Sequence, residues 1–257
     1  MPLCLTASAT IRRHLTTFAF LAAASAAFVL VTSDAQAVVR GRNAGGISRH
    51  VVKLVGHNLL CTATVIGRQQ VLTANHCVEG AGPFFVVTSA GKIAVTGHTP
   101  SGQATLLTLA TALPTSAEPI ATGEAQGDGS YTIAGYGTAQ ESARMHSAGL
   151  REARLVVDAK YGGLVDPNRR GPISASACMG DSGGPVARFD GKRYVLVGIV
   201  ERVSNYSGIG ACGFLTHYST IGGVPTYATE PSNSRAASEP TTPPRRQIRG
   251  AKEWAAR

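Results

Sequence analysis

Short apolar segments recur along most of the chain, with Gly, Pro, Asn and Asp between them. Such segments, bounded by turn residues, predict strands. The predicted strands are residues 50–55, 59–66, 70–74, 84–88, 92–96 and 105–109, then 131–136, 150–157, 184–189, 194–200 and 213–218. No long stretch of the sequence carries the 3.6-residue period of an amphipathic helix. The pattern therefore predicts an all-β sandwich or barrel, and periodicity alone does not choose between them.

Both ends of the chain differ in composition from the part between them. Basic residues 12–14 precede an apolar run at 15–31, and Ala-Gln-Ala follows at 35–37. This order is typical of a secretory signal peptide, so we expect residues 1–37 to be removed and the protein to be secreted or periplasmic. The run is also long enough for a membrane anchor, but Ala and Thr dilute it, and we expect no stable membrane insertion after cleavage. Residues 227–257, which are rich in Pro, Ser, Thr and Arg, are predicted to be a disordered basic tail.

The composition limits the kinds of molecule that the protein is expected to bind. With 257 residues, 44% of them hydrophobic, the chain can form one large domain or two small ones. Its formal net charge of +9 favours acidic surfaces. A nucleic-acid interface also needs stacking aromatic side chains among its basic residues, and aromatic residues make up only 6% of this chain. We therefore expect no nucleic-acid partner.

Cysteine usage predicts disulfides. The chain has five cysteines, and removal of the signal segment takes away Cys4. Four remain, an even number in an oxidising compartment, which indicates two disulfides in one of three pairings. A zinc site is the competing explanation, but no Cys-x2-Cys spacing occurs, so we expect no metal.

Two short motifs carry the candidate chemistry. Residues 180–185 read Gly-Asp-Ser-Gly-Gly-Pro, and residues 72–77 read Leu-Thr-Ala-Asn-His-Cys. A serine hydroxyl becomes a nucleophile when an imidazole takes its proton and peptide N–H groups face the oxyanion that forms. The glycines beside Ser182 permit backbone conformations that bring such N–H groups close to a substrate. Either motif alone fits a chance occurrence, but together with the cysteines they resemble the trypsin/chymotrypsin family of serine proteases.

The resemblance covers residues 38–218 and is specific around His76, Ser182, the cysteines and Ala-Gly-Tyr-Gly at 134–137. It implies two six-stranded antiparallel β-barrels with the active site in the cleft between them. It also implies Ser182 as nucleophile, His76 as general base, and the N–H groups of Gly180 and Ser182 as the oxyanion hole.

The resemblance further divides the mature chain. We expect the N-terminal barrel at residues 38–118 and the C-terminal barrel at 119–226, with the boundary in the Pro/Gly-rich stretch 114–129. It also implies two disulfide pairings, Cys61 with Cys77 and Cys178 with Cys212.

One position departs from the family. The family has an Asp that accepts a hydrogen bond from the catalytic His, fixes its tautomer and stabilises the imidazolium. This Asp precedes a stretch that matches residues 104–109, and the residue in its place is Gln103. An amide carries no charge, and in a studied member of the family the change from Asp to Asn costs about 10⁴ in kcat.

Glu201, just after the predicted strand 194–200, is the candidate replacement, because the family usually has a Ser there that bonds the catalytic Asp. We predict a relocated triad of Ser182, His76 and Glu201. The Gln103 amide would donate to Glu201, one oxygen of which would lie within about 3.2 Å of His76 Nδ1. The alternatives are an inactive scaffold with Glu201 facing solvent, or a misalignment at Gln103.

The start of the mature chain is the second departure. The family's mature chain begins with Ile-Val-Gly-Gly, and its freed α-amino group pairs with the Asp before the nucleophile. Here Val-Val-Arg-Gly follows Ala37, so signal cleavage itself would produce that terminus, and we expect Val38 to pair with Asp181. Arg40 stands at the first glycine position, and Arg tolerates fewer backbone conformations than Gly.

The expected substrate pocket contains no charge. Ser176 stands six residues before the nucleophile, where members that bind Arg or Lys have an Asp. Val203 stands where open pockets have Gly. Together with Gly213, these residues favour small or medium apolar P1 residues.

The sequence thus predicts a secreted serine endopeptidase. It would act on protein or peptide substrates through an acyl-enzyme, need no cofactor and be a monomer. The alternative is a catalytically inactive homologue that uses the cleft as a binding module for proteins or carbohydrate.

Overall fold

The computed structural model describes residues 37–80, 82–125, 129–138, 149–205, 208–209 and 212–222. The predicted signal peptide, apart from Ala37, and the predicted tail lie outside these residues. The described chain is mostly strand and turn, with two short 3-10 helices, η1 (Gly46–His50) and η2 (Asn75–Cys77). No helix in this part of the chain has the length and apolar character that crossing a membrane requires.

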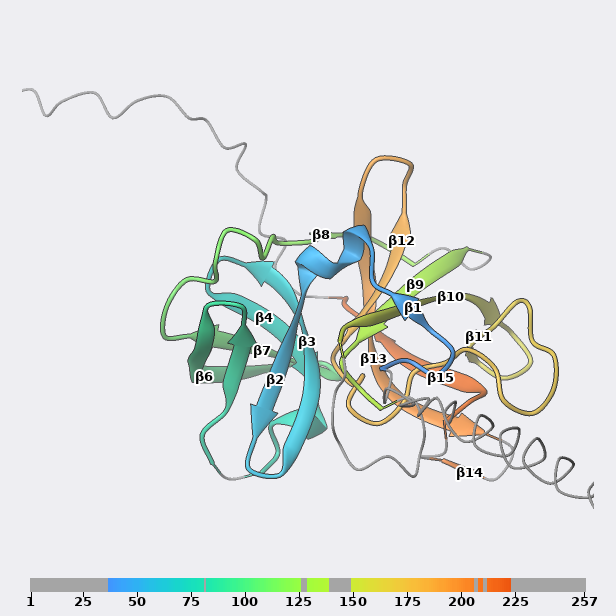
Figure 1. The fold of residues 1–257 in the computed structure, drawn as a ribbon, viewed down its shortest axis with the longest axis horizontal. Helices are drawn as coiled ribbons and strands as arrows, with labels where there is room; N and C mark the ends of the chain where they lie inside the picture. The colour runs from blue at the N-terminus through green and yellow to red at the C-terminus, as the bar shows by residue number, and fades with distance from the viewer. Residues whose placement is uncertain are drawn as a thin grey trace, which may run out of the picture.

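Six antiparallel strands close into the first barrel, at the left of Figure 1. They are β2 (Val51–Gly56), β3 (Leu59–Gly67), β4 (Gln70–Ala74), β5 (Phe85–Thr88), β6 (Gly91–Ser101) and β7 (Ala104–Leu109). Around the barrel their order is β2-β3-β4-β7-β6-β5. Leu54, Leu72 and Leu107 are fully buried in its core.

The second barrel, at the right of Figure 1, closes where β9 pairs with β10. Its strands are β9 (Ser130–Gly135), β10 (Arg151–Asp158), β11 (Gly163–Val165), β12 (Pro185–Phe189), β13 (Tyr194–Asn205) and β15 (Leu215–Thr220). Three two-residue strands add to it: β1 (Arg42–Asn43) pairs with β10, and β8 (Ala121–Thr122) and β14 (Gly208–Ile209) pair with β13. The expected fold class, two six-stranded antiparallel β-barrels, is confirmed.

A shared core joins the two barrels. Ala187 of β12 and Leu196 and Ile199 of β13 belong to the same buried cluster as the leucines of the first barrel. Because close-packed interiors resist deformation, residues of both barrels keep fixed positions where they meet. The two sequence motifs come together at this junction.

Candidate active site

Ser182 lies in the turn that precedes β12, and glycines set the path of that turn. Gly180 and Gly183 have φ angles of 95° and 83°, a region that residues with side chains disfavour. A Cβ on Gly183 would lie 2.2 Å from Thr73 Oγ1 and 2.3 Å from the peptide oxygen of Thr62. Glycine is required at this position because the first barrel lies directly against the turn.

Two threonines of β3 bind this turn from the first barrel. The N–H of Thr62 donates to the peptide oxygen of Ser182 at 2.9 Å, and the Thr62 hydroxyl donates to that of Gly180 at 2.8 Å. The Thr64 hydroxyl donates to the peptide oxygen of Gly183 at 2.9 Å. Both hydroxyl bonds are buried, where an unsatisfied partner costs about 1–3 kcal/mol. β3 therefore holds Ser182 in place.

The peptide N–H groups of the turn are not all used. The N–H of Asp181 donates to the oxygen of Cys178 at 3.0 Å, and that of Gly183 donates to the oxygen of Val200 at 2.8 Å. The N–H groups of Gly180 and Ser182 donate to no acceptor in the described part of the chain. Free donors in an otherwise bonded turn are able to stabilise a negatively charged oxygen.

Asp181 is buried beneath the turn, with 1% of its surface exposed. Its Oδ1 accepts from the N–H of Gly137 and its Oδ2 from the N–H of Cys178, each at 2.8 Å. The N–H of Val38 is a third donor. Burial raises the pKa of Asp181 from 3.8 to about 7, against these three N–H groups, which lower it. Within the described part of the chain, no positive partner keeps the carboxyl ionised.

The segment from Val38 to Gly41 enters the second barrel. Val38 is fully buried and has a φ of 53°, and exposed Arg40 has a φ of 50°. Val39 forms a β-bridge with Ser176, whose N–H donates to the Val39 oxygen at 3.3 Å. The two residues of the predicted terminal pair, Val38 and Asp181, are thus brought together, through a peptide N–H.

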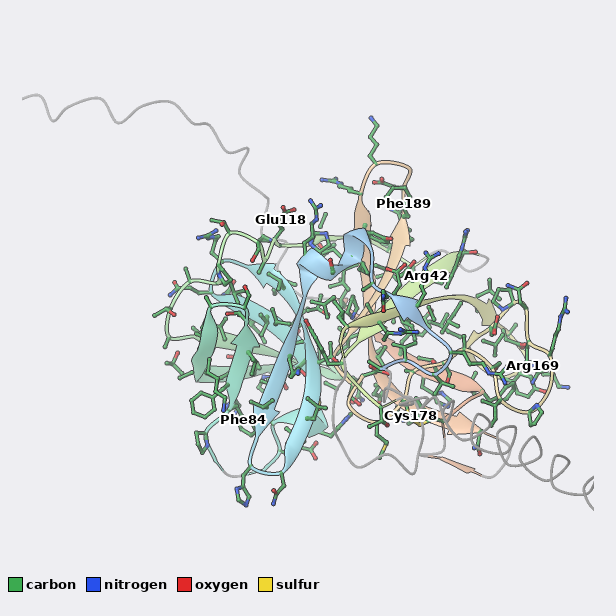
Figure 2. The ribbon with its side chains drawn as sticks, viewed as in Figure 1. Arg42, Phe84, Glu118, Arg169, Cys178 and Phe189 are labelled. Carbon is green, nitrogen blue, oxygen red and sulfur yellow. A yellow bond between two sulfur atoms is a disulfide. The ribbon has the colours of Figure 1, made fainter. Side chains whose placement is uncertain are left out.

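Both expected disulfides are confirmed, Cys61 with Cys77 and Cys178 with Cys212. Cys178 lies on the second barrel (Figure 2). A ring nitrogen of His76 lies within 4.8 Å of the sulfurs of Cys61 and Cys77. Because those sulfurs are bonded to each other, His76 is the only member of this group with a free ligand atom.

His76 and Ser182 are not hydrogen-bonded to each other in this conformation. The Ser182 hydroxyl donates to the peptide oxygen of Glu201 at 3.3 Å. His76, in η2, is exposed, and its ring has no hydrogen-bond partner among the described residues. In this conformation the Ser182 hydroxyl proton is directed at the Glu201 oxygen and not at the imidazole that would have to accept it.

The Glu201 carboxylate is occupied elsewhere. Its Oε2 accepts from the Ser219 hydroxyl at 2.7 Å, and its Oε1 accepts from Arg202 at 3.2 Å. The side chain is 23% exposed. The expected hydrogen bond between Glu201 and His76 is not among the contacts of the described residues, so the orienting role of Glu201 stays a prediction.

Gln103 lies beside the turn that carries His76. Its peptide oxygen accepts from the N–H of Asn75 at 3.3 Å, and its side chain is exposed, with no bond to Glu201 among the described contacts. Asn75 also clamps this turn, because its Nδ2 donates to Gly102 and its Oδ1 accepts from Thr105. Sequence reasoning missed Asn75, although it lies inside the motif of residues 72–77.

The expected pocket residues lie together on the second barrel. The Ser176 hydroxyl is buried; it donates to the peptide oxygen of Ala177 and accepts from the N–H of Gly213, both at 2.9 Å. Val203 is 4% exposed and packs in the same cluster as Cys178. The Ser176 hydroxyl is therefore already engaged, and no carboxylate stands in its place.

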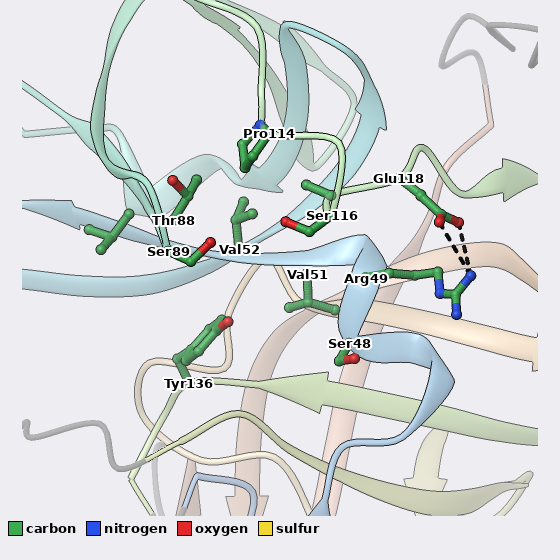
Figure 3. A pocket seen from close by; sticks show the side chains of 12 residues that line it. Ser48, Arg49, Val51, Val52, Thr88, Ser89, Pro114, Ser116, Glu118 and Tyr136 are labelled. Atoms are coloured by element: carbon green, nitrogen blue, oxygen red, sulfur yellow. Dashed lines mark hydrogen bonds and ion pairs between the residues drawn. The ribbon is translucent and has the colours of Figure 1, made fainter.

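A separate hollow of about 420 Å³ lies between η1, β2, the end of β5 and residues 114–118 (Figure 3). Its lining includes neither Ser182 nor His76. Tyr136 borders it, and burial raises the pKa of the Tyr136 phenol. The N–H of Tyr136 donates to the Thr62 hydroxyl at 3.0 Å. The hollow is thus distinct from the site that the motifs predict.

Comparison with known proteins agrees with the two-barrel fold. The family model described as Trypsin matches residues 38–222. A relative described as a trypsin-like protease, from Streptomyces glaucescens, is 30% identical over 191 residues, which are 63% of this chain and 71% of that protein. The chain belongs to the trypsin family of serine proteases.

Proposed function

We propose that the protein is a secreted serine endopeptidase with Ser182 as nucleophile and His76 as general base. The observation that carries this proposal is the turn around Ser182, in which the N–H groups of Gly180 and Ser182 have no acceptor among the described residues while the neighbouring N–H groups are bonded. Two disulfides in the described chain fit an oxidising compartment.

The reaction follows from these groups. The Ser182 hydroxyl turns from the Glu201 oxygen to His76, which takes its proton as the oxygen attacks the substrate carbonyl carbon. The resulting oxyanion accepts hydrogen bonds from the N–H groups of Gly180 and Ser182. The amine leaves with the proton from His76, and water, activated by the same imidazole, hydrolyses the ester to free Ser182.

Glu201 is proposed as the carboxylate that orients His76. Its peptide oxygen already binds the Ser182 hydroxyl, so the residue belongs to the same junction, and its carboxylate is 23% exposed. To reach His76, the side chain would exchange its bonds to Ser219 and Arg202 for one to the imidazole.

For the substrate, we propose small or medium apolar P1 residues. The Ser176 hydroxyl is already used within the protein, and Val203 adds bulk where a glycine would leave space. We also propose that the mature chain begins at Val38, whose ammonium would supply the positive partner that the buried Asp181 carboxyl lacks.

Labelling with a fluorophosphonate tests the proposal, because this reagent reacts only with an activated serine. We expect the secreted protein to be labelled at Ser182, and Ser182→Ala not to be labelled. Ser204→Ala is the matched control, since Ser204 is bonded to His217 away from the turn. Absence of labelling in a folded wild type would favour an inactive homologue that binds through the cleft.

A further inference from the structure

The segment that follows Val38 is fastened to β10 by two neighbouring charged residues. Glu152 is buried, with its side chain 3% exposed. Its Oε1 accepts from Arg42 at 2.8 Å, and its Oε2 accepts from the N–H of Gly45 at 2.9 Å. Arg151 donates to the peptide oxygen of Gly41 and, at 2.9 Å, to Asn43 Oδ1. Residues 41–45 are therefore held along their whole length.

This fastening continues to the buried end of the segment. The N–H of Gly41 donates to the oxygen of Val38 at 2.8 Å. A Cβ on Gly41 would lie 2.9 Å from the peptide oxygens of both Val38 and Glu152, so the chain passes tightly between them. Val38 in turn donates to Asp181, directly before Ser182. The path from Glu152 to the nucleophile turn is continuous.

The two members of the ion pair are not equivalent. Arg42 is 79% exposed, on β1 at the surface of the second barrel (Figure 2), so water competes for its charge. Glu152 is shielded, and a buried carboxylate is stable only when its oxygens are bonded. The Glu152 carboxylate therefore favours the state in which both Arg42 and Gly45 lie against β10.

We propose that Glu152 is a positioning residue, which docks residues 41–45 on β10 and thereby sets how firmly Val38 is held against Asp181. The proposal rests on the proposed function, because it concerns the mature terminus of that enzyme. Glu152 touches no reacting atom. Its effect reaches Ser182 through the segment that it fastens.

Docking has a measurable consequence for a chain that begins at Val38. Only the protonated α-amine pairs with Asp181, so docking keeps it protonated at higher pH. Each tenfold decrease in the equilibrium constant for docking lowers the alkaline pH at which activity is half-maximal by about one unit. The lower limit is the pKa of a free α-amine, about 7.7–8.0. A general loss of stability would not move this midpoint while the protein stays folded.

The experiment compares Glu152→Gln with Glu118→Gln. Glu118 also pairs with an arginine, Arg49, but both residues are exposed. Glu118 lies apart from Arg42 in Figure 2. Two quantities are measured in the secreted protein after its N-terminus has been sequenced: the alkaline midpoint of kcat/KM, and deuterium exchange of residues 37–46 and 176–184. Near-ultraviolet circular dichroism reports whether each variant is folded.

We expect Glu152→Gln to lower the midpoint by about one pH unit and to speed exchange of both segments about tenfold. Arg42→Ala, which keeps the buried carboxylate, should change the alkaline midpoint and the exchange rates in the same direction but by less. If Glu152→Gln does not fold, Arg42→Ala provides the test in its place. Tyr194 also titrates in alkali, and its pKa is raised by burial and by Glu152, so Tyr194→Phe must leave the wild-type midpoint unchanged.

Midpoints and exchange rates that are equal in Glu152→Gln and Glu118→Gln would overturn the proposal. A wild type that hydrolyses no peptide at any pH would overturn the proposed function instead. The exchange rates of residues 37–46 would then decide alone whether Glu152 docks the segment.

Discussion

Ser182 and His76 have contrasting surroundings, although the sequence pairs them. The turn of Ser182 is bonded on one side by β3 and on the other by the peptide oxygens of Val200 and Glu201. The His76 ring is exposed and unbonded among the described residues. Backbone groups and glycines complete the first half of the site, whereas the second half, if the proposal is right, needs a carboxylate from another element.

The contrast between the Ser182 turn and the His76 ring indicates which part of such a site tolerates substitution of its residues. A turn that is built from peptide groups stays in place as long as the barrels pack. An imidazole that needs a carboxylate partner loses its productive tautomer and the stabilisation of its charged form when one residue, such as the family's Asp, is exchanged. Variants of the two halves should therefore fail in different ways.

The largest effect is expected at the turn itself. In Gly183→Ala the new methyl group would meet Thr73 and the Thr62 peptide oxygen, and the φ of 83° would be strained as well. We expect a loss of about 3 kcal/mol or more in the free energy of unfolding, and no fluorophosphonate labelling. Urea denaturation and labelling rates measure both.

The matched control is Gly191→Ala. Gly191 has a φ of 95° with no atom within 4 Å of an added Cβ, so this variant carries the backbone strain without the crowding. It should cost about 1–2 kcal/mol and keep the wild-type labelling rate. Equal effects of the two substitutions would mean that contact with the first barrel does not hold the turn.

The next effect concerns the orientation of His76. Glu201→Gln should lower kcat by about 10²–10⁴, because an amide cannot stabilise the imidazolium. Gln103→Asp alone should change kcat little, whereas in the Glu201→Gln background it should restore activity by placing a carboxylate at the family position. A large gain from Gln103→Asp alone, with full activity in Glu201→Gln, would remove Glu201 from the mechanism.

A third effect comes from Asp181. While residues precede Val38, the pKa of Asp181 is about 7, above its ordinary value of 3.8, so the fold favours the protonated acid. The stabilisation is complete below about pH 4 and is lost as the pH rises to about 7, which amounts to about 4 kcal/mol. Urea midpoints of the extended chain should therefore fall from pH 4 to 8, and those of Asp181→Asn should lack this component.

A chain that begins at Val38 should show the opposite sign. Its ammonium depresses the pKa of Asp181, so the pair stabilises above the ordinary carboxyl pKa and is lost as the pH falls through the depressed value. If the urea midpoints changed with pH in the same way in the extended chain and in the chain that begins at Val38, that result would argue against an ion pair between Val38 and Asp181.

The smallest effect is expected at Arg40, where the family's glycine is missing. Its φ of 50° costs an L-residue about 1–2 kcal/mol, and glycine relieves that strain but loses more entropy on folding. Arg40→Gly should stabilise the protein by up to about 1 kcal/mol in urea denaturation. Arg40→Ala keeps the Cβ and should give no such gain.

Most of the strands followed from the apolar pattern because they alternate buried and exposed residues, whereas the two-barrel arrangement came from the family resemblance. Tyr131 and Ile133 alternate on β9, and Leu155 lies next to exposed Arg154 on β10. The three residues of β11 (Gly163–Val165) are too few to alternate and were not predicted. His50, predicted as strand, is the last residue of η1, and its ring Nδ1 bonds the peptide oxygen of Glu118.

The candidate site was predictable only where sequence neighbours decide the geometry. The glycines around Ser182 predict the turn in which it lies. The disulfide pairings were predicted from the family resemblance. The direction of the Glu201 side chain depends on Ser219, which β15 brings opposite across an irregular register between Val200 and Arg202. Likewise, the sequence shows Thr62 and Thr64 only as polar residues within a predicted strand, and it does not predict that their hydroxyls bind the turn of Ser182.

The φ of 53° at Val38 exists only while the peptide bond between Ala37 and Val38 is intact. This torsion is defined by the carbonyl carbon of Ala37, and for a β-branched residue it is an outlier. Hydrolysis of the bond between Ala37 and Val38 would delete the atom that defines it. The cut would then erase this conformational penalty and create a charge in one event, and of the two positive-φ side-chain residues in the segment only Arg40 would keep its strain.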